Sequence, residues 1–236
     1  MTARLAALAA AHARILARRR TALLVLALLP LAFYAALYRH NDHAIAVGGI
    51  ASAFSAGGAS IFSMLPARAA DRRLVLIGYR VWLLILGRLV VLEAGSLVIS
   101  AVTAAVMIAG SGPAHPGDAF AGVILVGAVA VPLGLALGAL LPRELEATLV
   151  LIGFVGIQLT SRSDTAISRF LPFHAAAQLL DASVGAPASI WPRLVMSAGW
   201  GIGLAAVAWL SWLRRVALRG SRRGVQAGRA IDLYSR

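Results

Sequence analysis

The sequence lacks two residue types entirely, cysteine and lysine, and is poor in charged residues. It contains no cysteine, which excludes disulfide bonds, thiolate metal sites and thiol catalysis. It also contains no lysine, so that all 22 basic side chains are arginines. Only 13% of the residues are charged, whereas 60% are hydrophobic. A soluble domain of 236 residues cannot bury so much apolar surface, because only part of a globule is interior.

Long apolar stretches predict that the chain folds in a lipid bilayer. Residues 21–38, 44–65 and 119–141 contain no charged side chain. At 1.5 Å per residue, each is about long enough to cross a ~30 Å hydrocarbon core. Further apolar stretches lie at about 89–109, 145–160 and 190–213. We therefore expect an all-α, polytopic integral membrane protein with six transmembrane helices.

The N-terminal residues predict an amphipathic helix that lies at the membrane interface. At 100° per residue, the apolar or weakly polar side chains of residues 2–18 fall on one side of a helix and the arginines on the other. The first group is Leu5, Leu8, His12, Ile15 and Leu16, and the second is Arg4, Arg14 and Arg18. Such a helix lies on the membrane surface or against a partner. The alternative is an arginine-rich flank that only sets the topology.

The distribution of arginine predicts the orientation of the six spans. With the N-terminus inside, the segments 1–20, 66–88, 142–146 and 214–236 carry eighteen arginines, and the outer segments carry four. This asymmetry follows the positive-inside rule and places both termini in the cytoplasm, with the chain in the plasma membrane. The domain order is then an interface helix at 1–20, a transmembrane domain at 21–213 and a basic tail at 214–236. Because the charge is spread over every cytoplasmic connection, nucleic acid is not expected as a partner.

The outer segment 161–189 is too interrupted to span a membrane and too apolar to be a free loop. It includes Phe170, Leu171, Phe173, Leu179 and Leu180 among small residues. We expect one or two short helices that re-enter the outer leaflet, packed on protein so that their backbone polar groups are satisfied. An ordinary interfacial helix is the alternative.

Motifs for catalysis are missing. The sequence has no phosphate-binding loop that ends in Lys-Ser or Lys-Thr, no His-Glu-x-x-His and no Gly-x-Ser-x-Gly. No enzymatic activity and no cofactor is therefore expected in this chain. His40-Asn41-Asp42-His43 is the one metal-like cluster, but a short outer turn of this kind is more often simply polar, and no metal site is predicted.

Several residues inside or beside the apolar stretches predict helix contacts. Glu93 lies about one turn inside the inner boundary and is expected to pair with Arg88 or another arginine, in a structural or gating role. Glu144 and Glu146 lie at the start of the fifth span, where their negative charge interacts favourably with the positive end of the helix dipole. Small residues recur every four positions at Gly49, Ala53 and Gly57, and again at Gly134 and Gly138. This spacing lets helices approach closely in lipid.

Together these features resemble the membrane subunit of a type-2 ABC (ATP-binding cassette) exporter. The resemblance lies in an amphipathic helix before six spans and in three degenerate motifs. The first runs from Ala70-Asp71-Arg72-Arg73 through Gly78 to Leu86-Gly87-Arg88, with Gly78 where the family usually has a proline. The second is the small-residue run from Leu133 to Pro142 at the end of span four. The third is Phe170-Leu171-Pro172-Phe173-His174, which is similar to an outer re-entrant pair of helices.

The resemblance implies a function and a set of partners. It implies a permease that exports an amphipathic molecule (a drug, a peptide antibiotic or a lipid-like compound), paired with a second copy or a relative. ATP and Mg²⁺ would be bound by a separate cytoplasmic ATPase subunit. The coupling link would be residues 66–80, and the residues expected to receive force from the ATPase are Arg14, Arg18, Asp71, Arg72, Arg73 and Arg80.

Three other functions remain open on the sequence: an assembly or immunity protein, a membrane enzyme and a secondary carrier. An assembly or immunity protein would be embedded in the membrane and bind partners without transport. An integral membrane enzyme would need a polar constellation that the sequence lacks, and a secondary carrier would usually show internal repeats.

Overall fold

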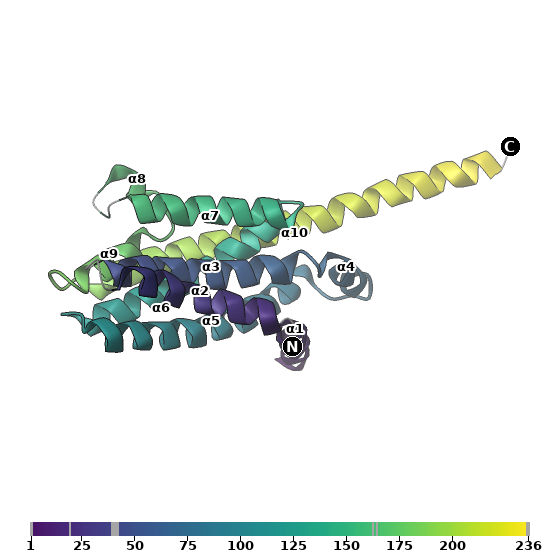
Figure 1. The fold of residues 1–236 in the computed structure, drawn as a ribbon. Coiled ribbons are helices and arrows are strands. Elements are labelled where there is room, and N and C mark those ends of the chain that lie inside the picture. Colours follow the sequence, from purple (N-terminus) through teal and green to yellow (C-terminus); the bar gives the residue numbers. More distant parts are fainter. Residues whose placement is uncertain (1, 19, 39–42, 162, 164, 235–236) are drawn as a thin grey trace.

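Helices account for all the regular structure of the described residues, in agreement with the expected all-α class. The computed structural model describes residues 2–18, 20–38, 43–161, 163 and 165–234, with side chains from 6 to 215. In chain order the helices are α1 (Thr2–Ala17), α2 (Arg20–Leu37), α3 (Ala44–Met64), α4 (Arg68–Leu76), α5 (Val81–Ser111), α6 (Pro116–Leu140), α7 (Glu144–Thr160), α8 (Ala166–Arg169), α9 (His174–Ala182) and α10 (Ile190–Tyr234). The longer helices run side by side along one axis (Figure 1).

Five of these helices are long and apolar enough to cross a membrane. They are Arg20–Leu37, Ala44–Met64, Val81–Ser111, Pro116–Leu140 and the Ile190–Arg215 part of α10. They identify the chain as an α-helical membrane protein. The fifth expected span corresponds to α7, which has 17 residues. α7 lies along α3, and it carries the chain from the end of the bundle at α4 to the opposite end at α8 (Figure 1).

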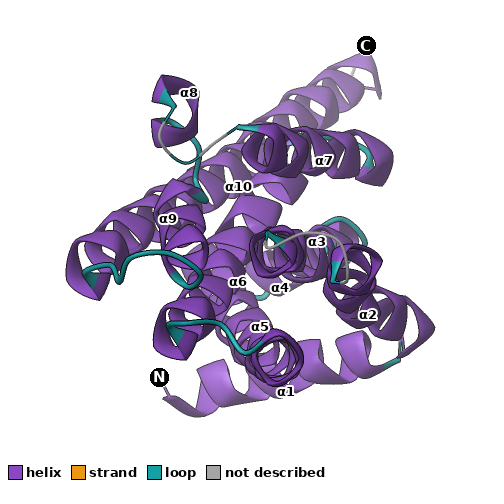
Figure 2. Ribbon diagram, turned by 60° about the vertical axis from the view of Figure 1, so that its left-hand side comes forward, coloured by secondary structure: helices purple, strands orange, loops and turns teal. Residues whose placement is uncertain are grey.

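α6 forms the centre of the bundle, with α3, α5, α9 and α10 packed around it (Figure 2). Every residue of α6 from Val129 to Ala139 is buried, because helices cover several of its faces. The tightest approach is at Gly134, where a Cβ atom would overlap the carbonyl oxygen of Gly57 and lie 2.7 Å from Ser60 Cβ. Gly138 lies in the same way against α3. The small residues of α6 thus lie where helices meet.

One element boundary differs from the sequence prediction. α5 begins at Val81 rather than near residue 89, so the helix continues through Arg88. This is possible because Arg88 has an acidic partner in the protein interior and does not need to end the apolar segment. On α1, Leu8 is buried against α5, whereas Ile15, on the same predicted apolar face, is exposed. The side chains of Leu5 and Arg4 lie outside the described residues.

The segment 161–189 contains two short helices, α8 and α9, in agreement with the one or two that were predicted. α9 packs against α6, α3 and α10, so its side chains from His174 to Ala177 are buried. Phe170, between the two helices, is exposed. Residues 40–42 of the metal-like cluster lie outside the described part of the chain.

Candidate functional site

The most unusual chemistry of the described residues lies at the end of the bundle that carries α1 and α4 (Figure 1). α4 is a short helix between the two long helices α3 and α5, and it projects beyond their ends. Figure 2 shows α1 lying across the bundle below α5, which it contacts. This end therefore presents two helices that do not follow the axis of the bundle.

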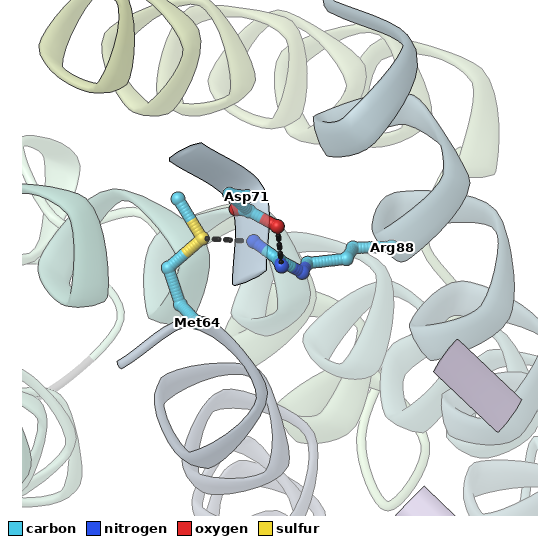
Figure 3. A network of polar contacts seen from close by, with 3 residues as sticks. All are labelled: Met64, Asp71 and Arg88. Atoms are coloured by element: carbon cyan, nitrogen blue, oxygen red, sulfur yellow. Dashed lines mark hydrogen bonds and ion pairs between the residues drawn. The ribbon is translucent and has the colours of Figure 1, made fainter. Parts of the chain in front are cut away.

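A buried ion pair joins α4 to the bundle. Arg88 Nη2 donates a hydrogen bond to Asp71 Oδ1 over 2.6 Å, and each side chain is only 1% exposed. Arg88 Nη1 points to the sulfur of Met64 at 3.1 Å (Figure 3). Residues from the end of α3, from α4 and from the first turns of α5 thus meet at one point.

The pair is incompletely satisfied. Arg88 Nε and Asp71 Oδ2 are buried without a hydrogen-bond partner among the described residues. The indole of buried Trp212, from α10, lies near enough to Asp71 to favour its ionised form, although its N–H does not reach hydrogen-bond geometry. Two charges buried in this way contribute little net stability, but the loss of one partner would leave the other charge uncompensated.

The two titratable groups at this site are both affected by burial. Desolvation raises the pKa of Asp71 above its ordinary value, and the neighbouring Arg88 opposes this rise. His12 of α1 lies against Gly87, beside the ion pair. Desolvation, helped by the positive charge of Arg88, lowers the pKa of His12 from 6.5 to about 4. The imidazole is therefore neutral at physiological pH.

Arginines tie the same end of the molecule to α6. Arg68, at the start of α4, donates to the carbonyl oxygens of Gly138 and Pro142 over 2.9 and 3.0 Å. Arg215 of α10 donates to the carbonyl oxygen of Leu140. The last carbonyl groups of a helix have no partner within it and carry partial negative charge, so cations bind there favourably. α4 is thus held by α6 at its first residue and by α5 at its ion pair.

The outward face of α4 combines apolar and cationic side chains. Leu76 is 83% exposed and Ile77 is 73% exposed. Leu76 is among the most exposed large hydrophobic residues that the structure describes. Arg72, Arg73 and Arg80 are exposed around them. We call Arg72, Arg73, Leu76, Ile77 and Arg80 the α4 surface. Arg14 on α1 and Arg18, directly after it, are also exposed at this end of the bundle.

The predicted ion pair between Glu93 and Arg88 is wrong. Arg88 pairs with Asp71, and no described ion pair includes Glu93, which is partly buried on α5. The reason is geometric: five residues at 100° each place Glu93 about 140° around the helix from Arg88. Asp71, expected in the coupling link with Arg72, is an interior residue, whereas Arg72 is exposed. Met64, Trp212 and Arg68 complete the site and were not expected from the sequence.

Within the ion pair, the arginine does not release its proton and the carboxylate faces protein, so the pair is suited to holding helices together. Its effect is mechanical: the ion pair and the Arg68 contacts fix a projecting helix to three long helices. No protein-family model matches this chain, and no curated protein is significantly similar to it.

Proposed function

We propose that this chain is the membrane subunit of an ATP-driven exporter, a type-2 ABC permease that moves an amphipathic molecule with energy from a separate ATPase subunit. The observation that carries the proposal is the α4 surface. A projecting helix with an apolar tip and a cationic rim suits a protein partner better than it suits either lipid or water. Its fixed attachment to the bundle lets a push on the helix move α3 and α5.

The proposal includes a topology of six spans, with α7 as the fifth. A helix of 17 residues is about 26 Å long, slightly less than the thickness of the hydrocarbon core. If α7 crosses, α1, α4, the α6–α7 turn and the end of α10 share one side of the membrane. That side carries most of the arginines and is the cytoplasm of the plasma membrane, where ATP is available. α8 and α9 then re-enter the outer leaflet, with Phe170 in contact with lipid.

Replacing Leu76 and Ile77 together by aspartate tests the proposed docking. Burial of each side chain against a partner contributes about 1.5 kcal/mol, so the double change should weaken ATPase binding by at least about tenfold. The measurement is co-purification with an ATPase encoded beside this chain, followed by ATP-dependent export from inverted vesicles. The matched control is Ile167→Asp, because Ile167 is 64% exposed at the opposite end of the bundle.

The outcomes separate the proposal from its main alternative. Retention of ATPase binding in the double variant would overturn the role of the α4 surface. A chain that purifies without any ATPase, and that supports no nucleotide-dependent export, would be a membrane-embedded assembly or immunity protein instead.

A further inference from the structure

A run of side-chain hydrogen bonds joins α8 and α9 to two long helices, at the end of the bundle opposite α4 (Figure 1). It passes from Gln158 of α7 through Ser168 of α8 to His174 and Gln178 of α9, and it ends at Arg193 of α10. The paired atoms lie 2.9 to 3.1 Å apart. Gln158, Ser168 and His174 are at most 5% exposed, so solvent has little access to these bonds. We call the five side chains the α9 joint.

The α9 joint requires a neutral His174. Arg193 Nε can only donate a hydrogen bond, and it donates to Gln178 Oε1 over 3.1 Å. Gln178 therefore presents its amide nitrogen, which is also a donor, to His174 Nε2 at 3.0 Å. His174 Nε2 has to accept this bond. The proton of the neutral ring is then on Nδ1, which donates to Ser168 Oγ over 2.9 Å.

Protonation of His174 removes the acceptor on which the α9 joint depends. An imidazolium ring carries an N–H group on both nitrogens, so Nε2–H would face the amide N–H of Gln178. If the Gln178 amide turned over, its oxygen would face His174, but its N–H would then face Arg193 Nε. In either orientation two donors oppose each other, and one bond between α9 and its neighbours is lost.

The surroundings of His174 disfavour a positive charge. No described ion pair includes His174, and the charges that act on it, those of Arg169 and Arg193, are both positive. Burial, together with these two arginines, lowers the pKa of His174 from its ordinary value of 6.5. The acids on the elements packed with it are Asp181, about two turns further along α9, and Asp118 at the start of α6. Neither acid is bonded to His174 among the described contacts.

We infer that the α9 joint is an acid-sensitive latch, which holds α8 and the first turn of α9 to α7 and α10 while His174 is neutral and releases them when His174 is protonated. The rest of α9 stays in place, because Leu180 packs against Gly49 of α3 and Gly122 of α6. Once released, the imidazole regains contact with water and binds a proton more readily than in the closed latch, so acid favours the open form. The latch is therefore closed above about pH 6.5 and opens as the pH falls further.

The latch goes beyond the proposed function, because it concerns the conformation of this chain alone. If the topology is as proposed, acid outside the cell loosens the segment that re-enters the outer leaflet. Neither an ATPase nor a transported molecule enters the test below. Failure of the exporter proposal would leave the latch intact, and failure of the latch would leave the exporter proposal intact.

Hydrogen–deuterium exchange of the purified full-length chain in detergent tests the latch at pH 7.5, 6 and 5. Exposure times are scaled to cancel the pH dependence of intrinsic exchange, and exchange in residues 166–178 is divided by that in residues 123–139 of α6. This ratio should rise at least about threefold between pH 7.5 and pH 5. Unfolding of the whole chain would raise exchange in both segments and leave no such rise. The comparison needs no variant, and a ratio that does not change with pH would overturn the inference.

Variants then identify the group that titrates. His174→Gln keeps an acceptor for Gln178 but does not titrate, so its ratio should stay constant with pH. Arg193→Ala should also weaken the pH dependence, because Gln178 can then turn its oxygen toward a protonated His174. His115→Gln is the matched control, since His115 directly precedes α6 at the same end, and it should keep the original profile. His43, before α3, is left unchanged in every variant.

The variants also define the results that would contradict the latch. A pH dependence that persists in His174→Gln, or that disappears in His115→Gln, would belong to another group and overturn the assignment. If His174→Gln fails to fold, Arg193→Ala decides: a pH dependence as large as that of the unsubstituted chain would overturn the latch.

Discussion

At the scale of single residues, the ion pair between Asp71 and Arg88 is the feature most sensitive to substitution. Removal of one partner leaves a buried charge, which costs about 3–5 kcal/mol. We expect Asp71→Ala or Arg88→Ala alone to lower the thermal stability strongly. The double variant Asp71→Leu with Arg88→Met should recover most of this loss, because it leaves no charge behind. Thermal unfolding in detergent, followed by tryptophan fluorescence, measures the difference.

Arg72→Ala is the control for the ion-pair variants, because Arg72 is exposed and its loss leaves the interior unchanged. If the double variant were as unstable as either single variant, the account of an uncompensated charge would be wrong. The double variant also separates folding from coupling. A stable chain that no longer exports would show that the pair transmits force as well as positioning α4.

A second prediction at the residue scale concerns His12 and pH. Because burial lowers the pKa of His12 from 6.5 to about 4, the unfolded chain binds a proton more readily than the folded chain. The contribution of His12 to stability should therefore be constant above about pH 6.5 and fall as the pH is lowered toward 4. His12→Leu should reduce this slope. Melting temperatures between pH 7.5 and 5 measure it, and identical slopes in the two proteins would contradict the prediction.

The sequence indicates the parts of this site but not their pairing. Asp71, Arg72, Arg73 and Arg88 all stand out by their position around a predicted link. Which acid meets Arg88 depends on how α4 folds back on α5, and periodicity along one helix does not contain that information.

At the scale of elements, α4 ends in a way that depends on one glycine. Gly78 has φ +96°, the Gly78 N–H donates to Val75 O and the Tyr79 N–H donates to Leu74 O. This is a Schellman motif, and it stops the helix so that Leu76 and Ile77 lie at its tip. A proline, with φ near −65° and no N–H, cannot take this place.

We therefore expect Gly78→Ala to destabilise the chain by about 1 kcal/mol, because a Cβ atom disfavours the left-handed conformation. Gly95→Ala is the matched control. Gly95 lies within α5 with no atom near its missing Cβ, so alanine there should be neutral or stabilising. Melting temperatures of the two variants in detergent provide the comparison. A similar fall of the melting temperature in both variants would show that the positive φ of Gly78 is not the cause.

Most element types follow from the sequence, whereas boundaries and exposed faces do so less well. The long apolar stretches predict their helices directly. The predicted start of α5 is eight residues late because Arg88 interrupts the apolar segment in the sequence. Arginine is a good helix former, so the helix continues through it, and the buried partner Asp71 compensates its charge. On the predicted apolar face of α1, Leu8 contacts α5 and Ile15 is exposed, so that contact of the face with lipid or a partner stays a prediction.

At the scale of the whole molecule, the topology depends on whether α7 crosses the membrane. The cysteine-free sequence permits a direct test with single cysteines, because no background thiol reacts. In intact cells, a membrane-impermeant maleimide should label Ala186→Cys, before α10, and should leave Ala69→Cys, on α4, unlabelled. Both positions are exposed. After the cells are opened, both should react equally.

Labelling of neither position in intact cells would mean that α7 stays on the cytoplasmic side, which would leave five spans and place the end of α10 outside. Labelling of Ala69→Cys alone would invert the topology and remove α4 from the reach of any ATP-driven partner.

The central position of α6 has a consequence for the route of any solute. The contacts of α6 with its neighbours, as close as that between Gly134 and Gly57, close the space between α6 and α3. If the chain exports a solute as proposed, the solute has to pass along another flank of the bundle, and a second copy packed against that flank would enclose its route.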